Sequence, residues 1–194
     1  MALARVFLLG GGFTAAAVPM VNGPFVAAAG GRSARIACVL LDGEDREEHF
    51  AGATGALSSV GAGATFPVFV SPNRSLKADD LAEATGVLVG GGSTPGYHDA
   101  LVGNAAEWLA PVLARGLPYA GYSAGAMIAP SRAIVGGWRL PADEPDAPGT
   151  VICPQEVNED EEFLDVRPGL GLVPFAVDAH ASHYGTLTRL LHAV

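Results

Sequence analysis

The segment from Gly121 to Gly125 has the pattern Gly-x-Ser-x-Gly, which can convert a serine into a nucleophile. It reads Gly-Tyr-Ser-Ala-Gly, and it lies between an apolar run and a run of small residues compatible with a helix. Flanking glycines permit a sharp strand-to-helix turn that holds the serine hydroxyl exposed at the carboxyl edge of a sheet. A glycine-rich turn with a serine helix cap fits the bare pattern equally well. The neighbouring runs favour the first interpretation, so Ser123 is the predicted nucleophile.

A serine nucleophile needs a base within hydrogen-bond distance, and the chain has five histidines. His180 follows an apolar run, Leu172–Val177, that has strand character. The carboxyl ends of strands are where open α/β sheets gather their sites, so His180 is the predicted base. His183 is the alternative, although a solvated loop position suits it better. His49 and His192 lie in charged, helical or terminal sequence typical of the surface.

Backbone amides for an oxyanion are expected from a second glycine run, Gly90-Gly91-Gly92, which follows the apolar segment Val87–Val89. The amide of Ala124, directly after the serine, would supply the other donor. A phosphate-binding loop is the rival interpretation. The run lacks both a Gly-Lys-Ser/Thr ending and a dinucleotide fingerprint, so no nucleotide and no other cofactor is predicted.

Composition limits the remaining possibilities. The chain has 194 residues, of which 49% are hydrophobic and 16% charged, which fits one folded domain spanning residues 1–194. A net charge of −9 opposes binding to nucleic acid. Two cysteines, Cys38 and Cys153, are too few for a disulfide framework or a cysteine-rich metal site, so free thiols, a cytoplasmic location and no metal are expected. The apolar N-terminal run ends at Gly10 and is too short for a membrane span, so no membrane association is expected.

Apolar runs alternate with helix-compatible stretches along the first two thirds of the chain. Because the runs are continuous, they predict strands that are buried on both faces, as in a parallel sheet covered by helices. The predicted strands are Arg5–Leu9, Ala34–Leu41, Thr65–Val70, Gly86–Val89 and Leu117–Gly121. The predicted helices are Ala51–Val60, Lys77–Ala84 and Tyr97–Arg115. This alternation indicates an α/β fold with a mostly parallel central sheet.

The other segments give weaker patterns. Val18-Pro19 and Gly23-Pro24 predict only a short helix or a loop within Ala15–Gly31. The acidic, proline-rich stretch Pro141–Asp165 predicts a surface excursion. A strand is expected in Leu170–Val177 and a terminal helix in Thr186–Val194.

With these motifs in place, the chain resembles the dipeptidase E and cyanophycinase family of serine peptidases. The resemblance lies in Val89–Thr94, in Gly121–Ala126, and in Leu170–Pro174 together with Val177–His180, and Arg189-Leu190 resembles an Arg-Leu pair that follows the family's histidine. It implies a three-layer sandwich of the class I glutamine amidotransferase-like type. It also implies that Ser123 attacks a peptide carbonyl, that His180 transfers the proton, and that Gly91 or Gly92 with Ala124 holds the oxyanion. A glutamine amidotransferase itself would carry cysteine in place of Ser123 at this turn, which is called the nucleophile elbow.

The chain departs from this family where an acidic residue usually follows the serine. Ser131–Trp138 contains no carboxylate, so the residue that orients the imidazole must come from the later acidic stretch. Glu156 is the predicted third member of the triad. The alternatives are Asp143, Glu144, Glu159 and Asp160. Asp178 is too close to His180 in an extended segment to orient it.

The resemblance also bears on substrate and assembly. It implies a peptidase for dipeptides or other small peptides, with a possible aspartyl preference on the acyl side. A small-ligand-binding or regulatory protein of the same fold is the second hypothesis, because the acid after the elbow is absent. The chain ends at Val194, soon after the histidine, whereas such relatives generally continue with further strands. Either a short variant or an incomplete sequence is expected, and an exposed sheet edge would favour a homodimer.

Overall fold

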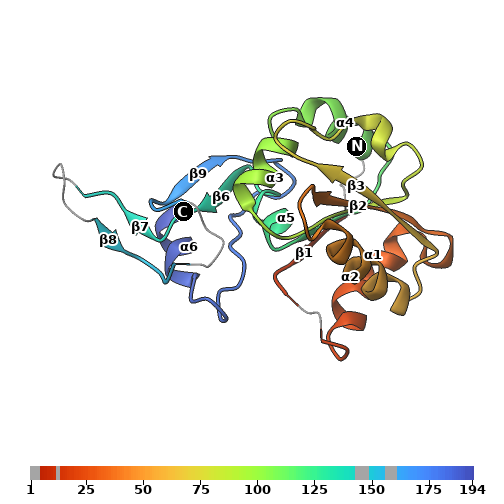
Figure 1. Cartoon of the computed structure of the whole chain (residues 1–194), viewed down its shortest axis with the longest axis horizontal. Helices are drawn as coiled ribbons and strands as arrows, with labels where there is room; N and C mark the ends of the chain where they lie inside the picture. Colours follow the sequence, from red (N-terminus) through yellow and green to blue (C-terminus); the bar gives the residue numbers. More distant parts are fainter. Residues whose placement is uncertain (1–4, 12–13, 143–148, 156–160) are drawn as a thin grey trace.

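A five-stranded parallel sheet forms the centre of the computed structural model, which describes residues 5–11, 14–142, 149–155 and 161–194. Its strand order is β1-β5-β4-β2-β3 (Figure 1). The strands are β1 (Val6–Leu9), β2 (Arg35–Leu41), β3 (Ala64–Val70), β4 (Gly86–Val89) and β5 (Tyr119–Tyr122). Each of the five predicted strands is present, and all four neighbouring pairs are parallel.

Alternate residues of the central strand β2 supply two separate cores. Ile36, Cys38 and Leu40 pack with one cluster of buried side chains, which includes Phe25 of α1 (Val18–Ala29). Ala37 and Val39 pack with the other cluster. Strands that are buried on both faces need apolar residues at every position, and this explains the continuous runs in the sequence.

Helices cover both faces of the sheet, which confirms the predicted three-layer α/β sandwich (Figure 1). The first face carries α1 (Val18–Ala29) and α2 (Arg46–Ser59). The second face carries the 3-10 turn η2 (Ala78–Leu81), α3 (Thr94–Leu101) and α4 (Ala105–Ala114). The edge strand β3 contains Pro67, whose missing N–H is tolerated at the edge of a sheet.

Two helix predictions need correction. The segment expected to be a short helix or a loop forms the 12-residue helix α1, with Pro19 in its first turn and Pro24 accommodated inside. Pro19 costs nothing there because the first amides of a helix have no intrahelical partner. The single helix expected over Tyr97–Arg115 is divided into α3 and α4. Trp108 of α4 is buried and donates its indole N–H to the carbonyl of Leu101, so the chain folds back at the division.

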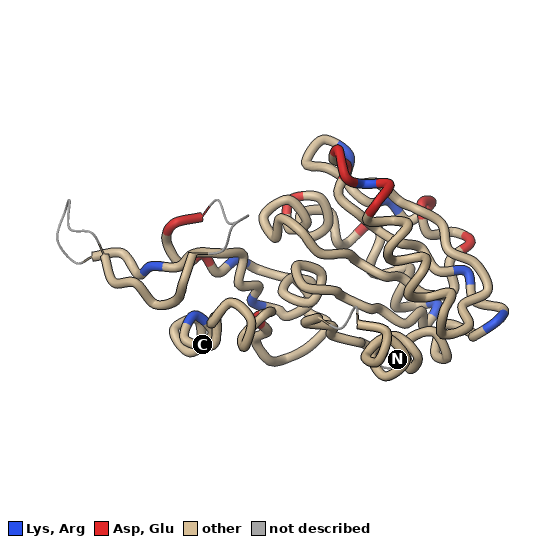
Figure 2. The backbone as a smooth tube through the Cα atoms, turned by 60° about the horizontal axis from the view of Figure 1, so that its bottom comes forward, with Lys and Arg blue, Asp and Glu red and all other residues tan. Residues whose placement is uncertain are grey.

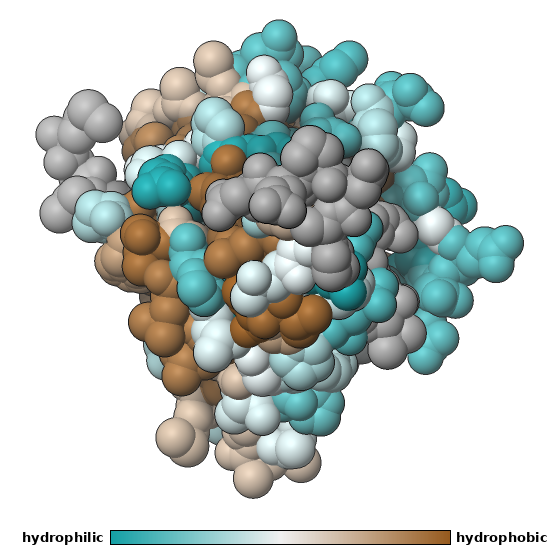
Figure 3. Space-filling model, turned by 90° about the vertical axis from the view of Figure 1, so that its left-hand side faces the viewer, coloured by the Kyte–Doolittle hydropathy of each residue, from teal (hydrophilic) through white to brown (hydrophobic). Residues whose placement is uncertain are grey.

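Beyond the sheet, the chain forms a smaller antiparallel region that lies beside α3 and α5 (Ala124–Met127) (Figure 1). It consists of β6 (Arg132–Gly136) paired with β9 (Asp165–Pro168), β7 (Arg139–Leu140) paired with β8 (Thr150–Val151), and the helix α6 (Leu187–Ala193). The terminal helix was predicted, whereas these strands were not. Figure 3 views the molecule from this end, where large apolar side chains are exposed, among them Val151, Phe163, Leu187 and Leu191.

The strand predicted within Leu170–Val177 is absent, and that prediction was wrong. The amides of Leu170 and Leu172 bond instead to the carbonyls of Ile128 and Ala129 in the loop after α5. One isolated bridge, between Pro130 and Val173, is the β-type pairing of this segment. The segment is therefore a loop held against the residues that follow α5, and it leads to His180 without forming a strand.

None of the helices in the described residues is both long and apolar enough to span a membrane.

The buried thiol of Cys38 should make the free energy of unfolding depend on pH. Burial on β2 raises the pKa of its thiol from 9.0 to about 12. The unfolded chain therefore loses this proton above pH 9 while the folded chain keeps it, so the stabilisation is complete below pH 9 and is lost as the pH rises toward 12. Between pH 8 and pH 10, the free energy of unfolding should fall by about 1 kcal/mol more in the wild type than in Cys38→Ala. Urea unfolding at both pH values measures this difference, and parallel losses in the two proteins would contradict it.

Candidate active site

Ser123 lies at the turn between β5 and the four-residue helix α5 (Ala124–Met127), at the carboxyl edge of the sheet. Its backbone has φ 49° and ψ −108°, a conformation that L-residues rarely adopt. The glycines of the motif permit this turn. A Cβ on Gly121 would collide with the carbonyl of Gly125, and one on Gly125 would lie 2.5 Å from the carbonyl oxygen of Val89. The local structure is the strained turn that the sequence pattern predicts.

Hydrogen bonds from three strands fix this turn. The amide of Ser123 donates to the carbonyl of Leu9 at the end of β1, with N···O 2.8 Å. The amide of Gly125 donates to the carbonyl of Gly90 after β4, at 3.0 Å. The hydroxyl of Tyr119, on β5, donates to the carbonyl of Gly125 at 2.7 Å, and burial raises the pKa of this tyrosine. The hydroxyl of Tyr119 thus remains a donor, and the serine is held by the sheet itself.

His180 meets the serine from the far end of the chain. Its Nε2 lies 2.8 Å from the Oγ of Ser123, which is hydrogen-bond distance for a base and its nucleophile. His180 also has a positive φ, 60°, and its ring packs edge-to-face against Tyr184 with centroids 5.0 Å apart. The alternative base, His183, is exposed and contacts Tyr184 with its ring, and no contact joins it to the serine.

A buried ion pair holds the loop that carries His180. The guanidinium of Arg189, on α6, donates to both carboxylate oxygens of Asp178, with Nε···Oδ2 2.8 Å and Nη2···Oδ1 2.7 Å. The two side chains are 1% and 0% exposed. The hydroxyl of Thr186 adds a bond of 2.7 Å to the carbonyl of Ala179. Asp178 therefore faces Arg189, and it contributes to the position of His180 through the backbone.

Two predicted oxyanion donors lie next to the serine. A Cβ placed on Gly91 would be 3.1 Å from the Cβ of Ser123, so the glycine run packs directly against the elbow. A Cβ on Gly92, where φ is 132°, would instead face Tyr97 and Leu41. Within the described ranges, the amides of Gly91 and Ala124 donate no hydrogen bond and are free for a ligand oxygen. Because α5 has only four residues, these amides themselves, rather than a long helix dipole, would carry the stabilisation.

The third member of the predicted triad has no counterpart in the described part of the chain. Glu156, Glu159 and Asp160, as well as Asp143 and Glu144, lie outside the described residues. Among the residues that are described, no carboxylate is hydrogen-bonded to the ring of His180. The described chain likewise contains no group of three His, Cys, Asp or Glu side chains suited to a metal ion.

A cavity of about 950 Å³ opens over the serine and the histidine. One wall is formed by α1 and α2, and the floor is formed by the ends of the central strands and the glycine run. Tyr122, Ser123 and His180 also line it. The pKa of Tyr122 is raised, mainly by burial and to a smaller extent by the neighbouring Tyr184. This wall could not be predicted from the sequence, because no motif marks α1 or the cavity face of α2.

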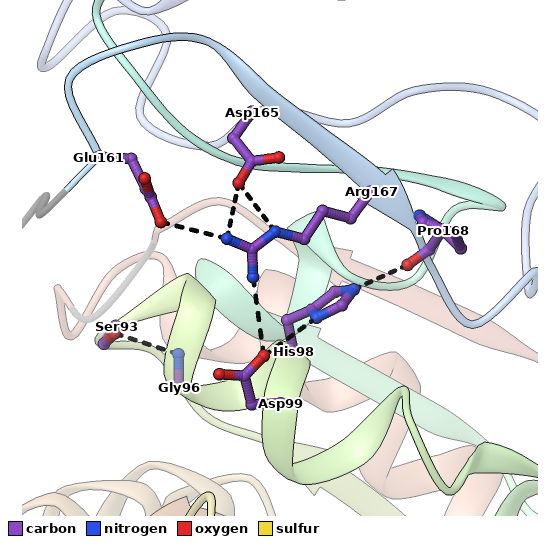
Figure 4. Close-up of polar contacts among 8 residues, drawn as sticks. All are labelled: Ser93, Gly96, His98, Asp99, Glu161, Asp165, Arg167 and Pro168. Carbon is purple, nitrogen blue, oxygen red and sulfur yellow. Dashed lines mark hydrogen bonds and ion pairs between the residues drawn. The ribbon is translucent and has the colours of Figure 1, made fainter.

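A second polar cluster, whose residues do not line this cavity, ties the small antiparallel region to α3 (Figure 4). The ring of His98, on α3, has its Nε2 2.8 Å from the carbonyl oxygen of Pro168, on β9. Arg167, also on β9, forms ion pairs with the carboxylates of Asp99, Glu161 and Asp165. The hydroxyl of Ser93 caps α3 by accepting from the amide of Gly96 at 3.2 Å. Since none of these side chains except the helix cap lies beside the glycine run, the cluster is a structural joint between the two regions.

The fold and the paired serine and histidine match a class of α/β hydrolases, and comparison with known proteins identifies the family. The model of peptidase family S51, the dipeptidase E family, matches residues 44–191, so the chain belongs to this family and is a peptidase. Among solved structures, that of a peptidase from an acI-B1 actinobacterium is similar in fold, with a TM-score of 0.59 and 16% sequence identity. The similarity covers 97% of this chain and 75% of that one. No curated protein is significantly similar in sequence.

Proposed function

We propose that the protein is a serine peptidase that hydrolyses small peptides, with Ser123 as nucleophile and His180 as general acid and base. The observation that carries the proposal is the distance of 2.8 Å between the serine Oγ and the histidine Nε2 at a strained elbow. Membership of a peptidase family is consistent with this chemistry.

The reaction follows from the arrangement of these groups. The serine hydroxyl donates its proton to the neutral Nε2 of His180 as Oγ attacks the peptide carbonyl. The oxygen of the tetrahedral intermediate accepts hydrogen bonds from the amides of Gly91 and Ala124. His180 then returns the proton to the leaving amine, which departs and leaves an acyl group on the serine. A water molecule, deprotonated by the same ring, releases the acid and restores the enzyme.

The substrate class is proposed from the size of the cavity. A volume of about 950 Å³ accommodates a dipeptide or a short peptide next to the serine. The aspartyl preference that the resemblance implied would require a cation in the cavity, and the described residues that line it include no lysine or arginine. Dipeptides and other small peptides therefore remain the proposed substrates without that preference. The third catalytic carboxylate, the homodimer and the cytoplasmic location stay predictions.

A non-catalytic ligand-binding protein is the second candidate, and the free oxyanion donors beside a paired serine and histidine count against it. An inert serine has no need for a strained backbone, which costs about 1–3 kcal/mol. The cavity by itself is compatible with either function.

Labelling with a fluorophosphonate separates the two candidates. We expect the probe to modify Ser123, as located by mass spectrometry of the digested protein, because the imidazole activates this hydroxyl. Ser123→Ala should abolish labelling. Ser58→Ala, at an exposed serine on α2, is the matched control and should label like the wild type. A wild-type protein that takes up no probe, or takes it up equally after Ser123→Ala, would reject the serine mechanism.

A further inference from the structure

The wall of the cavity formed by α1 comes from a part of the chain that precedes the family match. The match begins at residue 44, whereas α1 spans Val18–Ala29 and lines the cavity through Val18 and Asn22. The same cavity is also lined by small residues of α2, including Gly52, Gly55 and Ala56. The serine and the histidine line the same cavity. The side chains of the wall are thus placed to contact the substrate.

Asn22 is the buried polar side chain of this wall. It is only 7% exposed, and in the described part of the protein its amide has no hydrogen-bond partner. Its polar atoms are not fully sealed from solvent, and the residue lines the cavity. Buried polar groups are nearly always hydrogen-bonded. A ligand in the cavity would supply the missing partner.

The charge of the cavity opposes an acidic substrate. All 11 lysines and arginines of the sequence lie within the described residues, and none of them lines the cavity. Figure 2 shows these residues spread singly over the molecule rather than gathered on one face. On α2, Glu48 and His49 line the cavity and are exposed. The carboxylate of Glu48 would repel a substrate carboxylate.

The rest of the lining is apolar or small. The apolar lining residues include four leucines from three strands and from α2, namely Leu9, Leu40, Leu57 and Leu88. Transfer of an uncompensated carboxylate to such a surface is strongly unfavourable, whereas an aliphatic or amide side chain is accepted. The cavity therefore has walls for an aliphatic group and one amide for a polar neutral group.

We propose that the cavity selects peptides whose side chain beside the scissile bond is uncharged, either aliphatic or amide, and that Asn22 is the residue that binds an amide there. The inference rests on the proposed peptidase function and specifies its substrate class. Aspartyl peptides, which the family resemblance implied, are then poor substrates of this protein.

Three nearly isosteric side chains test the selection. Leu, Asn and Asp are compared in the dipeptides Xaa-Leu and in the reversed series Leu-Xaa, with kcat/KM measured from the released amino acids. In the series whose variable side chain occupies the cavity, we expect kcat/KM to be about tenfold or more higher for the Leu and Asn peptides than for the Asp peptide. In neither series should the Asp peptide have the highest kcat/KM. Asn22→Leu should lower kcat/KM for the Asn peptide about tenfold while the Leu peptide changes little. Met20→Leu, at an exposed position on the same helix, is the control and should leave all the ratios unchanged.

Binding to Ser123→Ala, followed by calorimetry, separates this inference from the proposed reaction. If Leu and Asn peptides bind more tightly than Asp peptides but the wild type hydrolyses none of them, the selection holds and the peptidase reaction is rejected. If Asp peptides bind or react best, or if Asn22→Leu affects the three side chains equally, the selection is rejected even where hydrolysis is observed. A variant that binds none of the peptides would reject both proposals.

Discussion

Replacement of His180 by alanine should lower kcat/KM for peptide hydrolysis by about 10⁴- to 10⁶-fold. The ring is the group that accepts the proton of Ser123, across 2.8 Å, and the described residues place no other base at that oxygen. Ser123→Ala should cause a loss of the same size. Because the two side chains act as a unit, the double variant should be no slower than either single variant. Steady-state rates on one good dipeptide, measured at high enzyme concentration, provide the comparison.

His183→Ala is the matched control for this prediction. His183 is exposed three residues along the same loop, and it contacts Tyr184 rather than the serine. We expect it to retain most of the activity. Thermal unfolding of each variant should show that the folded structure persists. If His180→Ala keeps more than about a tenth of the activity, the ring is not the base, and losses that multiply in the double variant would show that the two residues act separately.

The second large effect is on stability. Arg189→Met should lower the free energy of unfolding by about 3–5 kcal/mol, because it leaves the carboxylate of Asp178 buried without the guanidinium that binds both of its oxygens. Asp178→Asn should have a similar but smaller effect, since the amide retains one acceptor for Arg189. Urea unfolding measures both changes.

The exposed pair of Arg35 and Glu83 offers a matched comparison. Their side chains are 52% and 73% exposed, so Arg35→Met should cost less than about 1 kcal/mol. Equal costs for Arg35→Met and Arg189→Met would show that burial of the second pair does not matter. The effect of Arg189→Met on the active site can be measured as the fraction of the folded variant that reacts with a fluorophosphonate. We expect this fraction to fall, because Asp178 lies two residues before His180 and the ion pair helps to position that base.

The sheet and the elbow could be predicted because their signals are local. β4 and the part of β2 after Arg35 are buried on both faces, so their residues form unbroken runs without a polar side chain. The turn at Ser123 requires small residues on both sides, and the sequence shows them directly. Prolines misled the prediction for α1, since Pro19 occupies the first turn, where it is tolerated.

The features that the sequence did not show depend on contacts between distant residues. The segment after β9 has apolar residues like a strand, but its amides bond to carbonyls after α5, and no local pattern encodes that choice. Asn22 lies about 100 positions before the serine and belongs to no motif. Asp178 and Arg189 were both noticed in the sequence, yet their pairing became visible only with α6 folded against the loop. The acidic stretch gave several candidate carboxylates and no spacing to choose among them.

Ser123 and His180 are the two non-glycine residues of the described chain with positive φ. Each such backbone costs about 1–3 kcal/mol, so the pair that would perform hydrolysis is also a source of instability. Activity and thermodynamic stability therefore oppose one another at these two positions. In a lineage released from selection for hydrolysis, glycine would be favoured at both, and the loss of the reaction would make the protein more robust.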